Sequence, residues 1–394
     1  MFQLVEFSPY AYEFHEDPYP IYRRLRDEAP AYHNEELGFW ALSRHADVLA
    51  GFRDFERLSN RCGVSFDRDA FHEDADTTMS FLAMDPPRHT RMRALVSRGF
   101  TPRRVAELEP RIRTMAVEML SELEGRESCE FIGDFAGRLP MDVVSELLGV
   151  PAADRAMLRT WADTVVHREE GYEGLPAAAA EAALRMLHYF SELLADRKRG
   201  PGDDLTGALL RAELDGDRLS DKEIIGFLFL MIVAGNETTT KLLGNALYWL
   251  DRNPGERRKL EADPSLVPAW AEETLRYDNS TQALARIAAK DFELHGEKIR
   301  EGEKVVLLLG SANRDERAWE EPDRYQIDRN TRASLSFGQG THFCLGASLA
   351  HLEARIALEE VQRRLPSWRV DPDGLERVHS VNVRGFAALP LRIS

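Results

Sequence analysis

The 394-residue chain contains only three cysteines, Cys62, Cys129 and Cys344, which lie far apart in the sequence. This odd, scattered set predicts no disulfide framework and is typical of a reducing compartment, so we expect a cytoplasmic location. Positive charge is also scarce, since 51 lysines and arginines face 67 aspartates and glutamates and leave a net charge of −16. Because binding to phosphates requires a basic surface, nucleic acid is not an expected partner.

Long apolar segments are absent as well. The longest uninterrupted one, Phe227 to Ala234, is far short of the roughly 20 residues that span a bilayer. The N-terminus shows no basic region followed by a long apolar stretch, so we expect neither a secretory signal nor a membrane span. The chain is 43% hydrophobic and 30% charged, with no repeat, low-complexity tract or interdomain linker. We therefore expect one domain over residues 1–394.

One of the three cysteines stands in a glycine-rich loop. Cys344 belongs to the stretch SFGQGTHFCLGA, residues 336–347, and an apolar helix-forming run follows over residues 349–358. Glycine lets the backbone turn tightly and approach a flat ligand. The N–H groups and dipole of a helix N-terminus favour a thiolate, which is a good axial ligand for haem iron. A lone cysteine, by contrast, is more often a small buried apolar residue.

A second informative stretch lies near the middle of the chain. Ser220 and Glu223 form a capping-box pattern, and helical periodicity then continues to Asn253. At 1.5 Å per residue this helix is about 48 Å long. Its first half is apolar on nearly all sides, so it should run through the middle of the molecule. At its centre, AGNETTT (residues 234–240) contains glycine and three threonines, which are poor helix formers. This inconsistency indicates a functional site, with a simple helix kink as the alternative.

These stretches resemble the cytochrome P450 family. The pattern F-G-x-G-x-H-x-C-x-G matches the family's haem-binding loop at Phe337, Gly338, Gly340, His342, Cys344 and Gly346. AGNET resembles the family's A-G-x-acid-T motif, and Glu273 with Arg276 resembles its E-x-x-R signature. The resemblance covers essentially the whole chain. It implies a mainly α fold with small β-sheets, in which haem b lies between the long central helix and the cysteine-loop helix.

The resemblance also implies a role for each matched residue. Cys344 is the iron ligand, Phe337, Gly338, Gly346 and Ala234 line the haem, and His89, Arg93, Arg286 and His342 hold its propionates. Thr238 hydrogen-bonds dioxygen, and Glu237 helps to relay protons to it. Glu273 and Arg276 form a structural network whose third member is expected to be Arg324, with Arg329 as the other candidate.

The implied activity is that of a haem-thiolate monooxygenase, which uses O2 and electrons from NAD(P)H to oxidise a small hydrophobic substrate. Steroid, terpenoid, fatty acid and polyketide substrates all stay open, and the loops at 60–82 and 165–190 should line their pocket. The alternatives are a peroxide-dependent oxygenase of the same fold and a non-enzymatic haem-binding sensor.

The source of electrons must lie outside the chain. The sequence has no dinucleotide-binding glycine motif, no flavin motif and no multi-cysteine cluster, so we expect a separate ferredoxin and its NAD(P)H-dependent reductase. Residues 88–113 contain eight arginines and two glutamates. This stretch is a candidate docking surface for an acidic partner, and a set of merely solvated helices is the competing interpretation.

Overall fold

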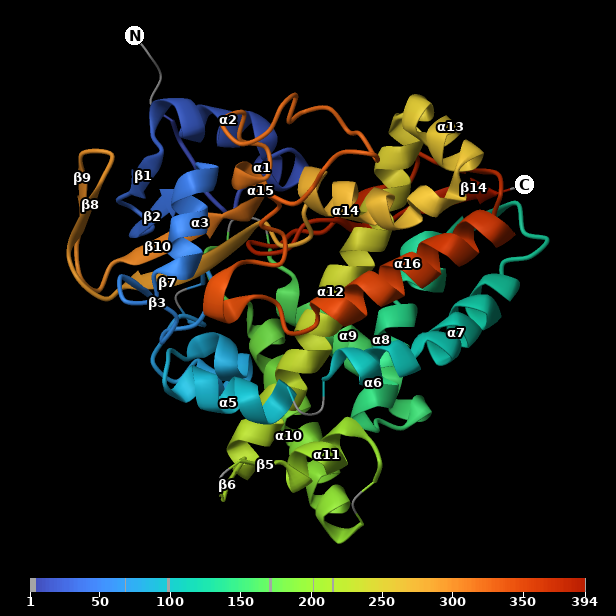
Figure 1. Cartoon of the computed structure of the whole chain (residues 1–394), viewed down its shortest axis with the longest axis horizontal. Coiled ribbons are helices and arrows are strands. Elements are labelled where there is room, and N and C mark those ends of the chain that lie inside the picture. Colours follow the sequence, from blue (N-terminus) through green and yellow to red (C-terminus); the bar gives the residue numbers. More distant parts are fainter. Residues whose placement is uncertain are drawn as a thin grey trace.

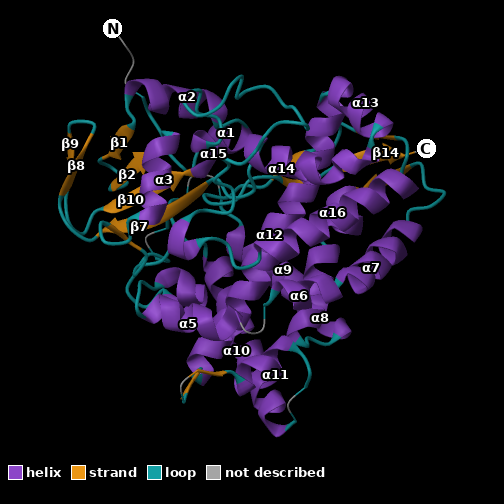
Figure 2. Cartoon of the chain, in the orientation of Figure 1, coloured by secondary structure: helices purple, strands orange, loops and turns teal. Residues whose placement is uncertain are grey.

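The computed structural model describes residues 5–67, 69–97, 100–169, 172–200, 202–214 and 216–393. Helices make up most of the molecule, and the larger part of the strands gathers on its left-hand side in the view of Figures 1 and 2. The first half of the chain contains the helices α1 (Tyr12–Glu16), α2 (Tyr19–Glu28), α3 (His45–Arg53), α4 (Asp76–Met79), α5 (Arg88–Ser97), α6 (Pro102–Glu107), α7 (Glu109–Ser121), α8 (Leu139–Leu148), α9 (Arg155–Val166) and α10 (Ala177–Arg199). The second half contains α11 (Leu205–Arg211), α12 (Asp221–Arg252), α13 (Pro254–Ala262), α14 (Val267–Tyr277), α15 (Leu309–Ala312) and α16 (Ala347–Arg364).

The longest of these helices, α12, crosses the molecule diagonally in Figure 1 and contacts α8, α9, α10, α14 and α16. It begins with the predicted capping box: Ser220 N–H donates to Glu223 Oε2 at 2.8 Å, and Glu223 N–H donates to Ser220 Oγ at 3.3 Å. Phe227, Leu228 and Ile232 are almost fully buried. The prediction of a long, buried central helix is confirmed, and its span of 32 residues agrees with the sequence pattern.

The largest sheet has the strand order β1-β2-β10-β7-β3. Its strands are β1 (Ala31–Asn34), β2 (Phe39–Leu42), β3 (Leu58–Ser59), β7 (Ala283–Ala288) and β10 (Lys304–Leu308). Strand β10 runs parallel to β2 and antiparallel to β7, where Val305 pairs with Arg286. All four residues of β2 are buried. Because the sheet is packed in this way, Arg286 is fixed at a buried position on a rigid strand.

The remaining strands form smaller sheets. They are β4 (Ser128–Glu130), β5 (Glu213–Leu214), β6 (Asp217–Arg218), β8 (Phe292–Leu294), β9 (Glu297–Ile299), β11 (Trp368–Val370), β12 (Glu376–Arg377), β13 (Phe386–Ala388) and β14 (Pro390–Ile393). Within the described part of the chain, no helix is long and apolar enough to cross a membrane. A mainly α fold with small sheets was the expectation from the sequence, and it is confirmed.

A buried ion network ties α14 to the loop before the cysteine stretch. Arg276 donates to both carboxylate oxygens of Glu273 at 2.7 and 2.8 Å, and both side chains are fully buried. The third member is Arg329, whose Nε lies 3.4 Å from Glu273 Oε1. The expectation that Arg324 takes this place is wrong, since its exposed side chain pairs with Glu321 instead.

The physical reason is the course of the loop. The Arg329 guanidinium donates to the backbone carbonyls of Glu320, Glu321 and Arg324. The chain therefore curls around this group, and the side chain of Arg324 is left outside the turn.

Candidate active site

Cys344 lies in the turn before α16 and is held by the backbone. Its N–H donates to the carbonyl of Phe337 at 2.9 Å. The side chain has exposed surface, yet protein atoms surround it closely, and this desolvation raises the pKa of the thiol. The N–H groups of Gly346 and Ala347 and the Arg93 cation act in the opposite direction. These donors and the Arg93 cation thus act to stabilise a thiolate at Cys344.

Three glycines shape this loop for two different reasons. Gly338 and Gly340 have φ angles of +67° and +70°, in the left-handed region that favours glycine. Gly346 has an ordinary φ of −83°. Around the place that a Gly346 Cβ would take, the nearest atom is Cys344 Sγ at 4.0 Å. The space beside the sulfur is therefore open. A flat group that lies on the sulfur would need this space.

Four basic side chains from three separate segments meet beside the thiol. His89 and Arg93 share one face of α5, Arg286 comes from β7, and His342 lies in the cysteine loop. The rings of His89 and His342 are 4.1 Å apart, and Arg93 and Arg286 both act on His342 electrostatically. Burial lowers the pKa of His89 to about 4, and burial together with Arg286 lowers the pKa of His342 further still. The resemblance implied these four residues, and the structure brings them together from α5, β7 and the cysteine loop.

Several polar atoms of this group have no hydrogen-bond partner. They are both ring nitrogens of His89, both ring nitrogens of His342 and Nη1 of Arg93, all of them buried. Burial also lowers the pKa of Arg286 to about 10, and its Nη1 donates only to the neighbouring carbonyl of Ala285 at 2.7 Å. Buried donors without acceptors are costly. The group therefore fits the carboxylates of a haem, and the thiol and the open space at Gly346 fit its iron and its flat ring.

Thr238 and Ala234 lie one turn apart on α12, and Ala234 is exposed while Thr238 is half-buried. Thr238 Oγ1 donates to the Ala234 carbonyl at 2.8 Å. Since a hydroxyl carries one proton, the Thr238 oxygen is left free to accept a hydrogen bond from another group. Such a bond to the preceding turn also loosens the helix, in agreement with the poor helix formers in this stretch.

Glu237 points elsewhere and is almost fully buried. Its Oε2 lies 3.3 Å from Lys241 Nζ, and its Oε1 accepts from Asn236 Nδ2 at 3.2 Å. Asp163 of α9 comes within hydrogen-bonding reach of the same carboxylate. Sequence reasoning missed both Lys241 and Asp163. The spacing of four residues between Glu237 and Lys241 was a usable signal for the first, whereas nothing local pointed to the second.

The two loops expected to line the substrate pocket are joined by a buried ion pair. Arg168 donates to Asp67 at 2.6 and 3.2 Å, and both side chains are buried. Ser65 and Tyr10 donate their hydroxyls to the same carboxylate. The loop at 60–82 and the loop after α9 are therefore held together at this point, although Arg68, Glu170 and Gly171 lie outside the described residues.

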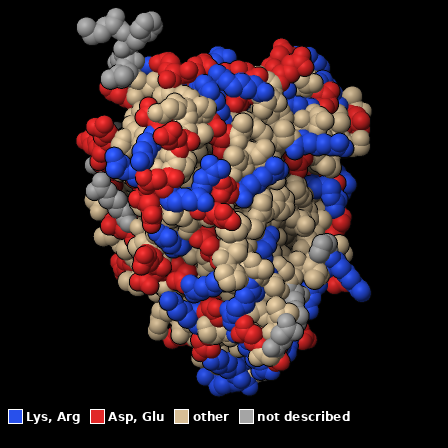
Figure 3. Space-filling view, turned by 60° about the vertical axis from the view of Figure 1, so that its left-hand side comes forward, with Lys and Arg blue, Asp and Glu red and all other residues tan. Residues whose placement is uncertain are grey.

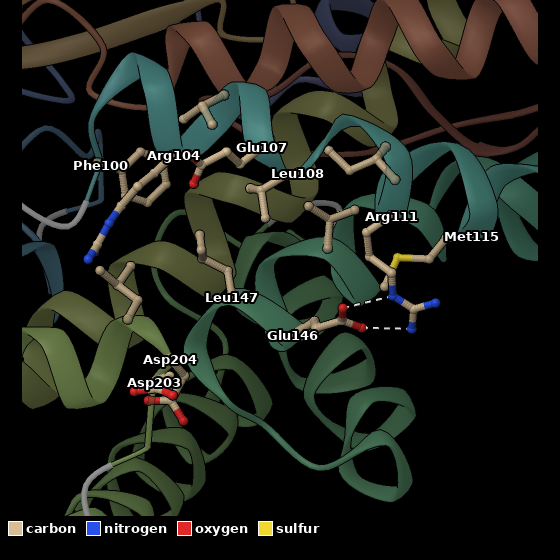
Figure 4. Close-up of a pocket in the computed structure, with 14 residues that line it drawn as sticks. Phe100, Arg104, Glu107, Leu108, Arg111, Met115, Glu146, Leu147, Asp203 and Asp204 are labelled. Carbon is tan, nitrogen blue, oxygen red and sulfur yellow. Dashed lines mark hydrogen bonds and ion pairs between the residues drawn. The ribbon is translucent and has the colours of Figure 1, made fainter.

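A cavity of about 320 Å³ lies elsewhere, between α6, α7, α8 and α11 (Figure 4). Leu108 and Leu147 line it, and the ion pair of Arg111 with Glu146 stands at its edge. Its described lining includes none of the site residues predicted from the sequence. We therefore do not assign it to the active site.

Comparisons with known proteins agree with this geometry. A family model described as Cytochrome P450 matches residues 177–376. Cytochrome P450 123 of Mycobacterium tuberculosis is 56% identical over 387 residues, with 98% of this chain and 96% of that protein covered. The vitamin D(3) 25-hydroxylase of Pseudonocardia autotrophica is 39% identical, with 96% of this chain and 94% of that protein covered. The crystal structure of CYP109E1 from Bacillus megaterium in complex with testosterone superposes with a TM-score of 0.90 at 34% identity, with 97% of this chain and 99% of that chain covered.

Proposed function

Because this chain belongs to the cytochrome P450 family, we propose that it oxidises a small hydrophobic substrate with electrons from a separate ferredoxin and its NAD(P)H-dependent reductase. Enzymes of this family are haem b monooxygenases, and the protein is an enzyme of this class. The bound haem supplies the redox chemistry, by which O2 is reduced and one of its oxygen atoms enters the substrate. We assign the whole chain, residues 1–394, to one haem domain and place it in the cytoplasm.

The observation that carries the assignment of the haem site is the pairing of the Cys344 thiol with four basic side chains, of which His89 and Arg286 are buried and Arg93 and His342 are half-buried. We assign Cys344 as the iron ligand, with the N–H groups at the start of α16 stabilising its charge. Phe337 supplies the carbonyl that accepts from the Cys344 N–H. Gly338 allows the tight turn of the loop, and Gly346 leaves space beside the sulfur.

The propionates are assigned to the donors that otherwise lack acceptors. His89, Arg93, His342 and Arg286 lie together, and their buried polar atoms can hold two carboxylates. Charge-assisted hydrogen bonds of this kind are the stronger ones in proteins. The same donors orient the haem ring, because they approach it from the side of α5, β7 and the cysteine loop.

We assign Ala234, Glu237 and Thr238 of α12 to the oxygen chemistry. The Thr238 oxygen has accepting capacity, so it can hold a proton-donating group in place beside the helix. Glu237 directly precedes it and is the titratable side chain nearest in sequence. We assign the delivery of protons to Glu237. The small side chain of Ala234 leaves room for a ligand to approach the helix.

For the electron donor we propose a docking surface formed by arginines of residues 88–113. Many of their charges are compensated: Arg91 pairs with Asp217 and Glu223, and Arg113 pairs with Glu359 and Glu360. Arg98 lies outside the described residues. On the face drawn in Figure 3, acidic and basic side chains are interspersed.

The net basic area is therefore smaller than the sequence suggests. We assign its centre to Arg103 and Arg104 of α6, which are exposed. Arg103 also pairs with Glu107 on the same helix at 3.0 Å, so Arg104 carries most of the net charge.

The substrate class is proposed from the relatives. One relative is named a vitamin D(3) 25-hydroxylase, one solved structure holds testosterone, and another similar protein is named for polyketide biosynthesis. We propose a substrate of this size and polarity, that is, a steroid, terpenoid, fatty acid or polyketide. The Asp67–Arg168 ion pair supports a pocket closed by the two loops that it joins.

The haem assignment is tested by the carbon monoxide difference spectrum of the reduced protein. Wild-type protein should give the strongly red-shifted Soret band of a thiolate ligand, and Cys344→Ser should abolish it, while Cys62→Ser keeps it. An unshifted band in folded wild-type protein contradicts the assignment.

The electron source is tested separately, on an accepted substrate. Product formation with NADPH, ferredoxin and reductase supports the proposal, whereas product with hydrogen peroxide alone contradicts it.

A further inference from the structure

The pocket between α6, α7, α8 and α11 has an apolar floor and a charged rim (Figure 4). Its volume is about 320 Å³, and pockets that hold small ligands begin at about 300 Å³. The walls include the half-buried side chains of Leu108 and Leu147. Buried apolar side chains form the floor, namely Phe100, Val105, Ile112, Met115, Val143 and Leu205. The space therefore suits a ligand with an apolar body.

Most of the acidic groups at the rim are paired with arginines. Arg111 donates to both carboxylate oxygens of Glu146 at 2.8 and 2.9 Å, on the right-hand side of the pocket in Figure 4. Arg155 lies 3.6 Å from the same carboxylate. Glu107 accepts from Arg103 at 3.0 Å. This part of the rim therefore offers no unpaired acid to a ligand.

The loop before α11 carries two aspartates, and two arginines lie beside it. Asp204 accepts from Arg197 Nε at 2.7 Å. Arg211 Nη1 donates at 3.1 Å to the carbonyl of Gly202, the residue directly before Asp203. The two positive charges balance the two negative ones at this loop, so it repels a bound anion only weakly.

Arg104 differs from the other charged residues of the rim. It is exposed, and no acidic residue of the described part of the chain forms an ion pair with it. Its backbone N–H donates to Thr101 Oγ1 at 3.3 Å and so caps α6, which fixes the helix that carries it. A guanidinium group binds carboxylates well. Beside an apolar floor, Arg104 therefore favours a ligand that combines a carboxylate with an apolar tail.

We propose that this pocket binds an amphiphilic carboxylic acid whose carboxylate pairs with Arg104 and thereby competes with the electron donor for that residue. The volume accommodates a tail of about ten carbons, if each takes about the 30 Å³ of a water molecule in the liquid. The tail lies along Leu108 and Leu147, and the carboxylate stays at the exposed rim. The competition rests on the docking surface proposed above, whereas the binding of the acid does not.

The binding is tested with decanoic acid that carries a photoreactive diazirine on its tail. The haem-loaded protein is labelled in the presence of phenylimidazole, whose ring nitrogen ligates the iron and keeps the acid out of the haem pocket. Mass spectrometry should find the label on peptides of α7 and α8. Excess decanoic acid should suppress this labelling, and decyltrimethylammonium should not. Absence of label from both helices, or equal suppression by the ammonium compound, overturns the proposal.

Two tryptophan variants fill the pocket from different walls. Leu147→Trp acts from α8 and Leu108→Trp from the turn between α6 and α7, so one of them serves if the other does not fold. Each folded variant should lose the label on α7 and α8. Leu184→Trp, at an exposed position of α10, is the matched control and should keep it. Undiminished labelling in a folded variant with a filled pocket overturns the proposal.

The role of the guanidinium is tested by calorimetry with decanoic acid, again in the presence of phenylimidazole. Arg104→Gln should weaken the binding about fivefold at low salt, as expected for an exposed ion pair. Arg103→Gln is the control on the same helix, because Arg103 already pairs with Glu107. Equal affinities of the two variants for the acid overturn the assignment of the carboxylate to Arg104.

The competition is tested by the rate of reduction by an acidic ferredoxin at low salt, without phenylimidazole. Saturating decanoic acid should slow reduction of the wild type about threefold and leave reduction by dithionite unchanged. It should not slow reduction of Leu147→Trp, which controls for acid in the haem pocket.

Arg104→Gln without acid separates the two ways in which this test can fail. A slow variant together with an unaffected wild type overturns the competition alone. A variant that is reduced as fast as wild type contradicts the docking surface, and the competition falls with it.

Discussion

Exchange of Arg329 for alanine should destabilise the protein, whereas the same exchange at Arg324 should not. Arg329 donates to the carbonyls of Glu320, Glu321 and Arg324 at 2.6, 3.1 and 3.1 Å and pairs with Glu273 at 3.4 Å. Each such hydrogen bond contributes about 0.5–1.5 kcal/mol net. The three carbonyls lie near the surface and can turn to water, so we take the lower end for each.

The sum is a loss of about 2 kcal/mol in the free energy of unfolding for Arg329→Ala, from four bonds near the lower limit of the range. The loss stays below that of a broken buried pair, about 3–5 kcal/mol, because Glu273 keeps Arg276 and the N–H of Gln326. Arg324 is exposed and pairs with Glu321 within one turn. Such surface pairs contribute about 0.2–1 kcal/mol, so Arg324→Ala should cost less than about 0.5 kcal/mol.

The assay is urea unfolding of the haem-loaded protein, followed by far-ultraviolet circular dichroism and by the Soret band in parallel. If both probes give the same unfolding midpoint, the change in the urea midpoint multiplied by the slope of free energy against urea concentration gives the change in the free energy of unfolding. Equal losses for the two variants, or a larger loss for Arg324→Ala, would refute the reasoning that the loop is organised around Arg329.

Two further predictions concern the partner surface and the haem. Exchange of both Arg103 and Arg104 for glutamine should slow reduction by an acidic ferredoxin about tenfold at low salt, because charges at the rim of an interface act mainly on association. Reduction by dithionite should not change. Arg258→Gln, on the exposed face of α13, is the control, and an unchanged rate with ferredoxin in the double variant would contradict the proposed docking surface. Exchange of Arg286 for leucine should speed the loss of haem to an excess of apomyoglobin at least about tenfold, since a charge-assisted hydrogen bond contributes about 1.5–3 kcal/mol. Arg300→Leu, at an exposed position, should leave the rate of haem loss unchanged. Equal haem loss from both variants would contradict the propionate assignment.

The local features of this protein could be predicted from the sequence with few errors. The capping box at Ser220 and Glu223 and the length of α12 both follow from interactions between residues close in the chain. The cysteine loop was equally readable, because its glycines are needed for local backbone angles. The pairing of Glu273 with Arg276 is also local, at three residues apart on one helix.

Apart from Lys241, which lies four residues after Glu237, the errors and omissions concern partners that are distant in sequence. Arg324 was preferred over Arg329 because sequence spacing says nothing about how a loop without regular structure curls. Asp163 was not noticed at all, since it lies far from Glu237 in the chain and meets it only where α9 packs on α12. The arginines of residues 88–113 looked more basic in the sequence than they are in the fold, because acidic residues from other segments pair with them.

The sequence by itself determined the central helix, since its length and its cap depend on residue type and on spacing within a few turns. Through the resemblance it also led to the prediction of Cys344 as the iron ligand and of Thr238 as the oxygen-site threonine. Only the tertiary structure decided how the four basic groups meet, which arginine completes the network and which acid stands behind Glu237. The physical reason is that charges and hydrogen-bond donors act over a few ångströms in space, whatever their separation along the chain. Packing of α9 against α12 brings Asp163 to Glu237, and the fold brings α5, β7 and the cysteine loop together.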